Sequence, residues 1–372
     1  MINSLKDFFD IISEPVISFT ALTIIFPFIF PPTDWFDKIH RKLGLHYIWT
    51  NKGGIALMVL TTLFFFMGYT DSEFSIILSK ADNFPIVLMI YSMLFVIWYS
   101  MKKAYVNDAR IDEGKKPSEY HDPEDKVLVW PDLVYIEFIA LLLFMAFLIV
   151  WSIVLSAPLE EPANAAATPN PSKAPWYFLG LQEMLVYFDP WIAGILFPIF
   201  IILGTSAIPY MDINKSGDGY YSFKQRRVGV FIFMYGWIAL WMYLIVIGTF
   251  FRGPNWNFYG PFEWWDPHKV VPLNNINLSE YVWVYLLGQA TPDSIFMRES
   301  VGFILVFGYL FALPLILSKT WLKKMYHAYG PVRYAFLCMF GLTMLSLPIK
   351  MFLRWTINLK YIIYIPEWFF NI

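Results

Sequence analysis

The sequence predicts an all-α fold, a polytopic transmembrane helical bundle with seven or eight spans. Hydrophobic residues make up 58% of its 372 residues and charged residues only 15%, whereas soluble domains average about 45–50% apolar and about 25% charged residues. The apolar residues also gather into runs close to the roughly 17–25 residues that cross a bilayer. The chain is therefore expected to fold in a membrane.

Seven apolar runs are long enough to span. They cover residues 54–70, 84–101, 132–156, 190–210, 228–251, 300–318 and 334–353. Residues 15–31 form a shorter eighth candidate that contains Pro15, Pro27 and Pro31. Both a true span and a re-entrant or interfacial segment fit this eighth run.

The loops between the runs differ in their content of lysine and arginine. Four are rich in these residues: 32–53, 102–131, 211–227 and 319–333. The loops that alternate with them are poor: 71–83, 157–189 and 252–299. Because basic residues concentrate in cytoplasmic loops, the basic set should face the cytoplasm and the first residues the opposite, positive side. Lys350, Arg354 and Lys360 fit this topology less well.

The histidines argue against a redox centre held by this chain. All five are expected in loops: His40, His46, His121, His268 and His327. A b haem with two histidine ligands needs both on facing helices, and no two of these histidines show metal-ligand spacing with acidic or sulfur partners. His40 and His46 are expected to be exposed or near lipid headgroups. A net charge of −2 excludes a strong overall attraction to nucleic acid.

Three segments carry a resemblance to a known family. They are "EPANAAATP" at 161–169, "APWYF" at 174–178 and "IPYMDINKSGDGYYSFKQRRVGVFIF" at 208–233. The first is similar to the run E-P-A-N-P-F-A-T-P of the C-terminal half of cytochrome b, which is subunit IV in cytochrome b6f complexes. The second stands where that family has Pro-Glu-Trp-Tyr, and the third is similar to the link into its third helix. The order of spans and loops also agrees, so the chain from about Asp132 to Phe251 resembles this unit.

The resemblance implies a haem-free subunit of a quinol:cytochrome c oxidoreductase, as in bacterial menaquinol:cytochrome c reductases. The subunit would form part of the quinol-oxidation site on the positive side, where protons are released. The b haems and a Rieske 2Fe–2S cluster would belong to partners, a haem-bearing N-terminal-type cytochrome b subunit and a Rieske protein. A c-type cytochrome is a further expected partner. The complex is expected to be dimeric and to lie in the bacterial energy-conserving inner membrane.

The same resemblance points to the residues that would bind quinol. They are Pro175, Trp176, Tyr177, Phe178 and Leu181. Aromatic rings form an apolar wall suited to a flat quinone, and the Tyr177 hydroxyl offers a polar handle. Pro175 occupies the position of the family's glutamate, a candidate proton acceptor, although proline cannot accept a proton.

Two acidic residues are candidates for proton transfer or quinone binding. If the segment from Trp176 is helical, Glu183 returns to the Trp176 face and would join Tyr177 in catalysis as the proton acceptor. The alternative is that Glu183 faces water. Asp132 lies near the family's inward-facing quinone-reduction site. The alternative for Asp132 is an acid in the first turn of a helix, stabilised by the helix dipole.

The resemblance divides the chain into three parts. Residues 1–131 form an N-terminal extension with two or three membrane segments, 132–251 the subunit IV-like unit, and 252–372 a C-terminal extension with two spans. The aromatic loop 252–299 could hold interfacial anchors or dock a partner. A different function is a haem-free quinone-binding anchor of another respiratory oxidoreductase. A transporter would be expected to show internal repeats, and no clear repeat is present.

Overall fold

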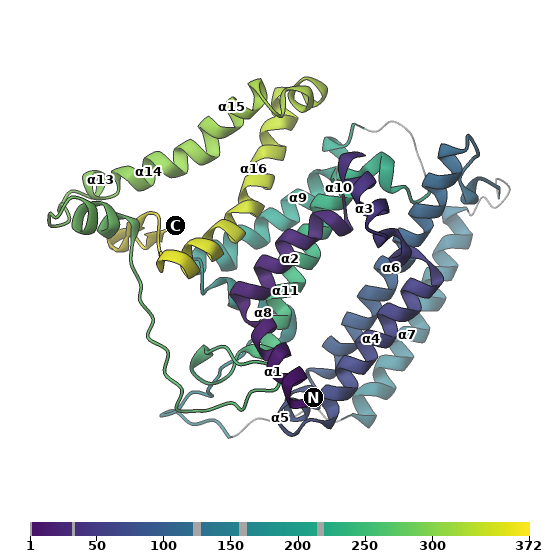
Figure 1. Ribbon diagram of the computed structural model, residues 1–372, viewed down its shortest axis with the longest axis horizontal. Helices are drawn as coiled ribbons and strands as arrows, with labels where there is room; N and C mark the ends of the chain where they lie inside the picture. Colours follow the sequence, from purple (N-terminus) through teal and green to yellow (C-terminus); the bar gives the residue numbers. More distant parts are fainter. Residues whose placement is uncertain (1, 32–33, 122–127, 156–161, 214–218) are drawn as a thin grey trace. The chain divides into compact units, whose positions relative to one another are not determined.

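The computed structural model describes residues 2–31, 34–121, 128–155, 162–213 and 219–372 (Figure 1). Among them, seven helices are long and apolar enough to cross a membrane. They are Asn51–Thr70, Phe84–Asp112, Val129–Val154, Ile192–Met211, Phe223–Phe251, Ser300–Lys319 and Lys323–Ile357. Each corresponds to one predicted run, so the all-α polytopic transmembrane bundle is confirmed.

The eighth candidate is a bent pair of helices, α1 (Ile2–Ser13) and α2 (Pro15–Ile29). Residues Asn3–Ser13 and Pro15–Ile29 meet at an angle of 76°, and counting the pair as one span gives eight. Pro15 begins α2 at a position where its missing amide hydrogen removes no helical hydrogen bond. The bend is compatible with a broken span and with a re-entrant segment.

The chain forms two compact units. The first contains residues 1–26, 170–217 and 232–372, and the second contains 27–169 and 218–231. The first unit therefore takes segments from all three parts predicted from the sequence. That three-part division stays a prediction.

The second unit is built mainly on the α4–α6 pair. Its helices are α3 (Asp34–Lys42), α4 (Asn51–Thr70), α5 (Ser72–Leu78), α6 (Phe84–Asp112), α7 (Val134–Val154) and the first turns of α10 (Phe223–Met234). Short 3-10 turns at Leu45–Trp49 and Ser118–His121 and a π turn at Val129–Leu133 complete it. Asp71 caps α5 by accepting from the amides of Glu73 and Phe74, at 2.9 and 2.8 Å.

Two expectations about this unit are wrong. Helix α6 continues to Asp112, so Lys102, Lys103 and Arg110 lie on the helix and not in a loop. His40 is not exposed or placed at the headgroups: it lies in α3 and is buried. Its Nε2 atom has no hydrogen-bond partner among the described residues. Burial, and then the nearby positive charges of His46 and Arg41, lower the pKa of His40 from 6.5 to about 4.

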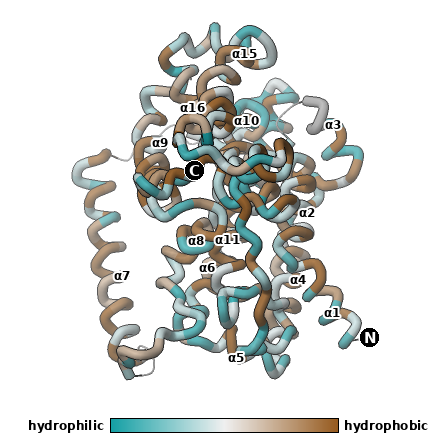
Figure 2. Tube along the Cα trace, turned by 90° about the vertical axis from the view of Figure 1, so that its left-hand side faces the viewer, coloured by the Kyte–Doolittle hydropathy of each residue, from teal (hydrophilic) through white to brown (hydrophobic). Residues whose placement is uncertain are grey.

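Helix α7 has no buried residue, although it is the most hydrophobic of the seven spans. Hydrophobic colouring predominates along its length in Figure 2. In water such a helix would be unstable, because its apolar surface would stay solvated. Within its own unit, α7 therefore leaves its apolar surface uncovered.

The first unit gathers most of the remaining helices. They are α8 (Trp176–Met184), α9 (Phe197–Met211), α11 (Tyr243–Val246), α12 (Leu278–Glu280), α13 (Ile295–Arg298), α14 (Ser300–Phe307), α15 (Leu313–Lys319) and α16 (Lys323–Ile357). Turns of π type lie at Ile192–Leu196, Tyr235–Met242, Ile247–Phe251, Tyr281–Leu286 and Gly308–Ala312. Helix α8 packs on α11, and α16 packs on α9 and α15. A hairpin of β1 (Tyr364–Ile365) and β2 (Phe370–Asn371) closes the chain, with a 3-10 turn at Pro366–Trp368 between the strands and another at Pro254–Trp256.

Helix α16 is interrupted near its start. Gly330 has a φ of 75°, which glycine tolerates, and Pro331 follows it. His327 lies in the helical turns before this break, so its placement in a loop was wrong. The longer part of α16 contains the predicted run 334–353.

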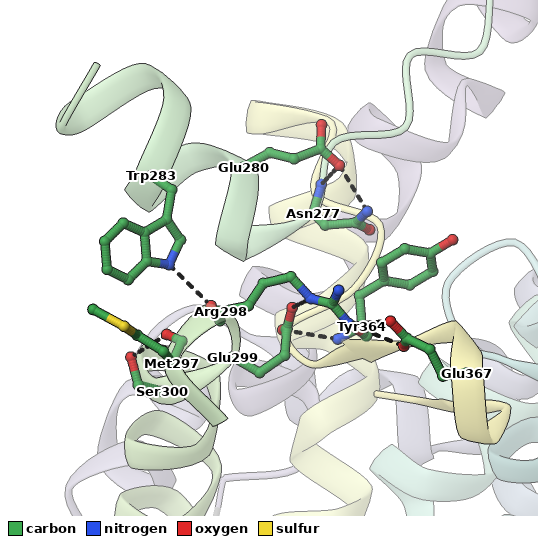
Figure 3. Close-up of polar contacts among 9 residues, drawn as sticks. All are labelled: Asn277, Glu280, Trp283, Met297, Arg298, Glu299, Ser300, Tyr364 and Glu367. Atoms are coloured by element: carbon green, nitrogen blue, oxygen red, sulfur yellow. Dashed lines mark hydrogen bonds and ion pairs between the residues drawn. The ribbon is translucent and has the colours of Figure 1, made fainter. Parts of the chain in front are cut away.

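A polar cluster joins the start of α14 to the C-terminal segment (Figure 3). Glu299 is buried and accepts from the Tyr364 amide at 2.9 Å and from Arg298 Nε at 3.2 Å. Arg298 also donates to both carboxylate oxygens of Glu367 at 3.0 Å, and its carbonyl accepts from the Trp283 indole at 3.1 Å. Glu299 and Arg298 thus tie the start of α14 to the C-terminal segment, and this cluster is a structural clamp.

Within each unit, segments expected on one side of the membrane lie close together. In the second unit, His40 of α3, Tyr105 of α6 and Lys224 of α10, all expected on the cytoplasmic side, line one cavity of about 40 Å³. In the first, the Asp10 carboxylate accepts from the Phe262 amide at 2.8 Å, and both segments are expected on the positive side. The orientation relative to the cell stays a prediction.

Candidate functional site

Helix α8 carries the predicted site, and its start at Trp176 agrees with the helix expected there. Its buried face consists of Leu179, Gly180, Glu183 and Met184. A Cβ atom on Gly180 would lie 3.4 Å from the Ile245 side chain of α11. The small residue therefore lets the two helices approach closely, side by side in Figure 1.

Hydrogen bonds from polar side chains hold the proline-rich loop before α8 in place. Gln182 donates to the Ser172 carbonyl and accepts from the Ala174 amide, both at 2.8 Å. Lys173 donates to the Thr249 carbonyl at 2.8 Å. Asn170 accepts from the Asn255 amide at 2.6 Å and donates to the Asn255 side chain at 2.9 Å. Because prolines remove amide donors from this loop, these contacts supply the order that a backbone ladder cannot.

Glu183 is paired with Arg252, at the end of the span that contains α11. Arg252 Nη2 donates to Glu183 Oε1 at 2.6 Å, and Arg252 Nε donates to Oε2 at 3.0 Å. The Glu183 side chain is only 1% exposed, so the alternative that it faces water is wrong. Burial opposes the charge of Arg252, but Glu183 more than offsets this and raises the pKa of the guanidinium. The Arg252 Nη1 atom also donates to the Trp256 carbonyl at 3.0 Å.

Tyr187 lies close to this ion pair and shares its environment. Its side chain is buried, in the turn that follows the end of α8 at Met184. Burial, and then the negative charge of Glu183, raise the pKa of the Tyr187 hydroxyl. The phenol therefore stays neutral beside the pair.

The residues of the predicted quinol site differ in their exposure. Tyr177 and Phe178 are 51% and 52% exposed, and their ring centroids lie 4.8 Å apart. Trp176 and Leu181 are half-buried, and Pro175 is exposed. We call Tyr177 and Phe178 the aromatic face of α8. Glu183 lies on the buried face, so the structure does not bring Glu183 and Tyr177 together.

A cavity of about 840 Å³ lies beside α8, in the first unit. The helix and the turn after it contribute Gln182, Leu185 and Val186 to its lining, and Arg252 lies there too. None of the predicted quinol-binding residues lines it. Sequence reasoning missed Arg252, although a lone arginine directly after an apolar span, in a loop otherwise poor in basic residues, was a usable signal.

Asp132 is the candidate for an inward-facing quinone site. Asp132 is exposed in the π turn Val129–Leu133, before α7. It lies in the second unit, while α8 lies in the first. Among the described residues, no group of three or more histidine, cysteine, aspartate or glutamate side chains could hold a metal ion.

No protein-family model and no solved structure matches this chain. Helix α8 is held on one face by the buried Glu183–Arg252 ion pair and exposes the rings of Tyr177 and Phe178. Such a face can stack against a flat apolar ligand that a second surface covers.

Proposed function

We propose that the chain is a haem-free subunit, of the cytochrome b C-terminal type, of a quinol:cytochrome c oxidoreductase. It forms part of the quinol-oxidation site on the positive side of a bacterial inner membrane, and menaquinol is the expected substrate. The b haems and the Rieske cluster belong to partner subunits, and a c-type cytochrome accepts the electrons. The complex is a dimer.

The aromatic face of α8 is the observation that carries this proposal. It follows directly after the loop whose sequence resembles the family's quinol-site motif. The Gln182, Lys173 and Asn170 contacts hold that loop in place, and the Glu183–Arg252 pair fixes the rotation of α8. Tyr177 and Phe178 then project outward as one wall of a site that a partner subunit completes.

The exposure of α7 supports the same proposal. A span with no buried residue makes no core of its own. In the family that the chain resembles, the corresponding helix is the first of the subunit IV-like unit. Contact with the haem-bearing subunit would cover part of its apolar surface.

Oxidation of a quinol removes two electrons and two protons. The electrons pass to the redox groups of the partners. The Tyr177 hydroxyl would hydrogen-bond a quinol oxygen at this exposed wall. Glu183 stays the predicted proton acceptor, but its two oxygens already accept from Arg252, so it could take a proton only after that pair opens.

Purification of the chain with its native partners tests the proposal. We expect no haem absorbance from the chain alone, and b-haem absorbance with a Rieske-type paramagnetic signal from the complex. A complex with quinol-dependent activity but neither signal would instead identify a quinone-binding anchor of another oxidoreductase. Association with no redox protein at all would contradict both functions.

A further inference from the structure

Three basic residues at and just after the end of α16 form a cation cluster, in which Lys350 and Arg354 are buried and Lys360 is half-buried. Lys350 and Arg354 are one helical turn apart, and Lys360 follows the end of the helix. The exposed fractions of Lys350 and Arg354 are 2% and 8%. Among the described residues, none of the three has a carboxylate oxygen within 4.0 Å.

Neutral groups alone hold this cluster. Arg354 donates to the carbonyls of Asn274 and Asn358 at 2.9 and 3.1 Å, and to the Asn275 side chain at 2.7 Å. Lys350 Nζ donates to the Lys360 carbonyl at 2.7 Å. Carbonyl dipoles and aromatic rings reduce the cost of burying a cation, but a buried charge is normally paired.

Lys360 is the least satisfied of the three cations. Within the described part of the chain, its ammonium group donates only to the Val186 carbonyl, at the long distance of 3.5 Å, and it lies 5.4 Å from the centre of the Tyr361 ring. Burial and then the positive charge of Arg354 lower the pKa of Lys360, and Asp189 offsets part of this. Asp189 itself accepts from the Tyr361 hydroxyl at 2.8 Å. Lys360 therefore keeps hydrogen-bond donors for an anion.

Two cations of the cluster, Arg354 and Lys360, line the 840 Å³ cavity beside α8, and so does Asn275. Apolar lining comes from Leu185, Val186, Val271 and Leu273. A cationic wall beside apolar side chains, at the end of a membrane span, is complementary to a lipid with a negatively charged headgroup.

The other charged residues of the cavity do not neutralise the cluster. Arg252 is paired with Glu183, and Lys269 with Glu263 at 2.9 Å. Asp10 accepts from the Phe262 amide, and Glu14 is exposed. Among the described residues that line the cavity, the cations without a carboxylate oxygen within 4.0 Å are therefore Arg354 and Lys360.

We infer that Arg354, Lys360 and Asn275 bind the phosphate group of an anionic phospholipid, whose acyl chains lie along the apolar lining of the cavity. This inference does not rest on the proposed function, because it concerns residues outside α8 and needs no redox partner.

Native mass spectrometry of the full chain, stripped of lipid in detergent, tests the inference. We expect dioleoylphosphatidylglycerol to bind more tightly than dioleoylglycerol, which lacks the phosphate. Lys360→Gln should weaken phosphatidylglycerol binding about tenfold, the effect of losing one hydrogen bond between charged groups. Lys269→Gln is the matched control: it removes a cation that lines the same cavity but is paired, and should leave binding unchanged.

Two further arms keep the test decisive. Leu273→Glu, at an exposed position of the lining, adds a negative charge without touching the buried cluster, and should also weaken phosphatidylglycerol binding. Equal binding by wild type, Lys360→Gln and Leu273→Glu would overturn the site. No preference for phosphatidylglycerol over dioleoylglycerol, together with retention of inorganic phosphate, would identify the free ion as the occupant and overturn the lipid.

Discussion

The Glu183 carboxylate and the Arg252 guanidinium form a two-pronged ion pair between α8 and the end of the span that contains α11. The residues are 69 positions apart in the sequence. The pair lies beneath the aromatic face of α8, and Arg252 also binds the Trp256 carbonyl of the following loop. One contact therefore couples the rotation of α8 to the loop after the span.

Removal of one partner of this pair should be strongly destabilising. Arg252→Gln leaves the buried Glu183 carboxylate without a counter-charge, so we expect a loss of about 3–5 kcal/mol in the free energy of unfolding. Thermal unfolding in detergent, followed by tryptophan fluorescence, measures it. Lys269→Gln breaks the more exposed pair with Glu263 and should cost less than about 1 kcal/mol. Equal losses would show that the Glu183–Arg252 pair is not desolvated.

Asp108 in α6 should stabilise the start of α10 in a similar way. Its carboxylate accepts from the amides of Phe223 and Lys224, both at 3.0 Å, and from the Ser222 hydroxyl. Asp108→Ala leaves these donors unsatisfied, and we expect a loss of about 1–3 kcal/mol in unfolding experiments. Asp112→Ala, one turn further along α6, removes only a half-exposed ion pair with Lys224 and should change stability by less than about 1 kcal/mol.

His40 should make the chain sensitive to acid. The pKa of His40 is about 4 in the folded chain and 6.5 in the unfolded chain, so between these two pH values only the unfolded chain binds the proton. The contribution of neutral His40 to the free energy of unfolding is therefore complete above pH 6.5 and falls as the pH drops from 6.5 towards 4. His40→Gln should flatten this dependence in unfolding midpoints measured across that range. His268→Gln, at an exposed histidine, should not; an unchanged slope in His40→Gln would assign the acid sensitivity to other groups.

The spans could be predicted from sequence because hydrocarbon thickness and hydropathy fix them locally. Each of the seven runs lies in a helix, and the errors are at the ends. Helix α6 extends to Asp112 although its last turns are polar. Asn107 accepts from the Ser118 amide and donates to the Tyr221 carbonyl. Asp108 accepts from the Phe223 amide. Such bonds join residues far apart in the sequence, so periodicity does not reveal them.

The site was less predictable than the fold. The helix from Trp176 follows from local pattern, but the burial of Glu183 depends on Arg252, which lies in a different loop. Lys350, Arg354 and Lys360 fit the rule for basic loops less well. Lys350 and Arg354 are buried, whereas the rule describes exposed charges near the ends of spans.

The side of the membrane that each loop faces can be measured with introduced cysteines. Thr168→Cys and Leu273→Cys should react with an impermeant thiol reagent applied from the positive side, and Tyr221→Cys should not. All three positions are exposed, and the native Cys338 is buried, so background labelling should be low. Labelling of position 221 alone from outside would invert the orientation.

The role of Glu183 in proton transfer is the sharpest test of the proposed chemistry. Glu183→Gln should slow quinol oxidation by the assembled complex by at least about tenfold, since a positioned general base contributes about 10²–10⁴-fold. Tyr177→Ala should instead weaken quinol binding, because Tyr177 lies on the exposed aromatic face and not beside Glu183. Steady-state turnover at saturating quinol, and its dependence on quinol concentration, separate these effects.

A comparison with Arg252→Gln distinguishes proton transfer from support of the fold. Both variants break the same ion pair, but only Glu183→Gln removes the carboxylate that could accept a proton. If Glu183 is the acceptor, Arg252→Gln should retain more turnover than Glu183→Gln in complexes assembled to the same extent. It should also shift the pH profile, because Glu183 no longer has to leave the guanidinium before it is protonated. Equal losses with unchanged pH profiles would mean that the pair only orients α8, and that the quinol proton goes to a group outside this chain or to water.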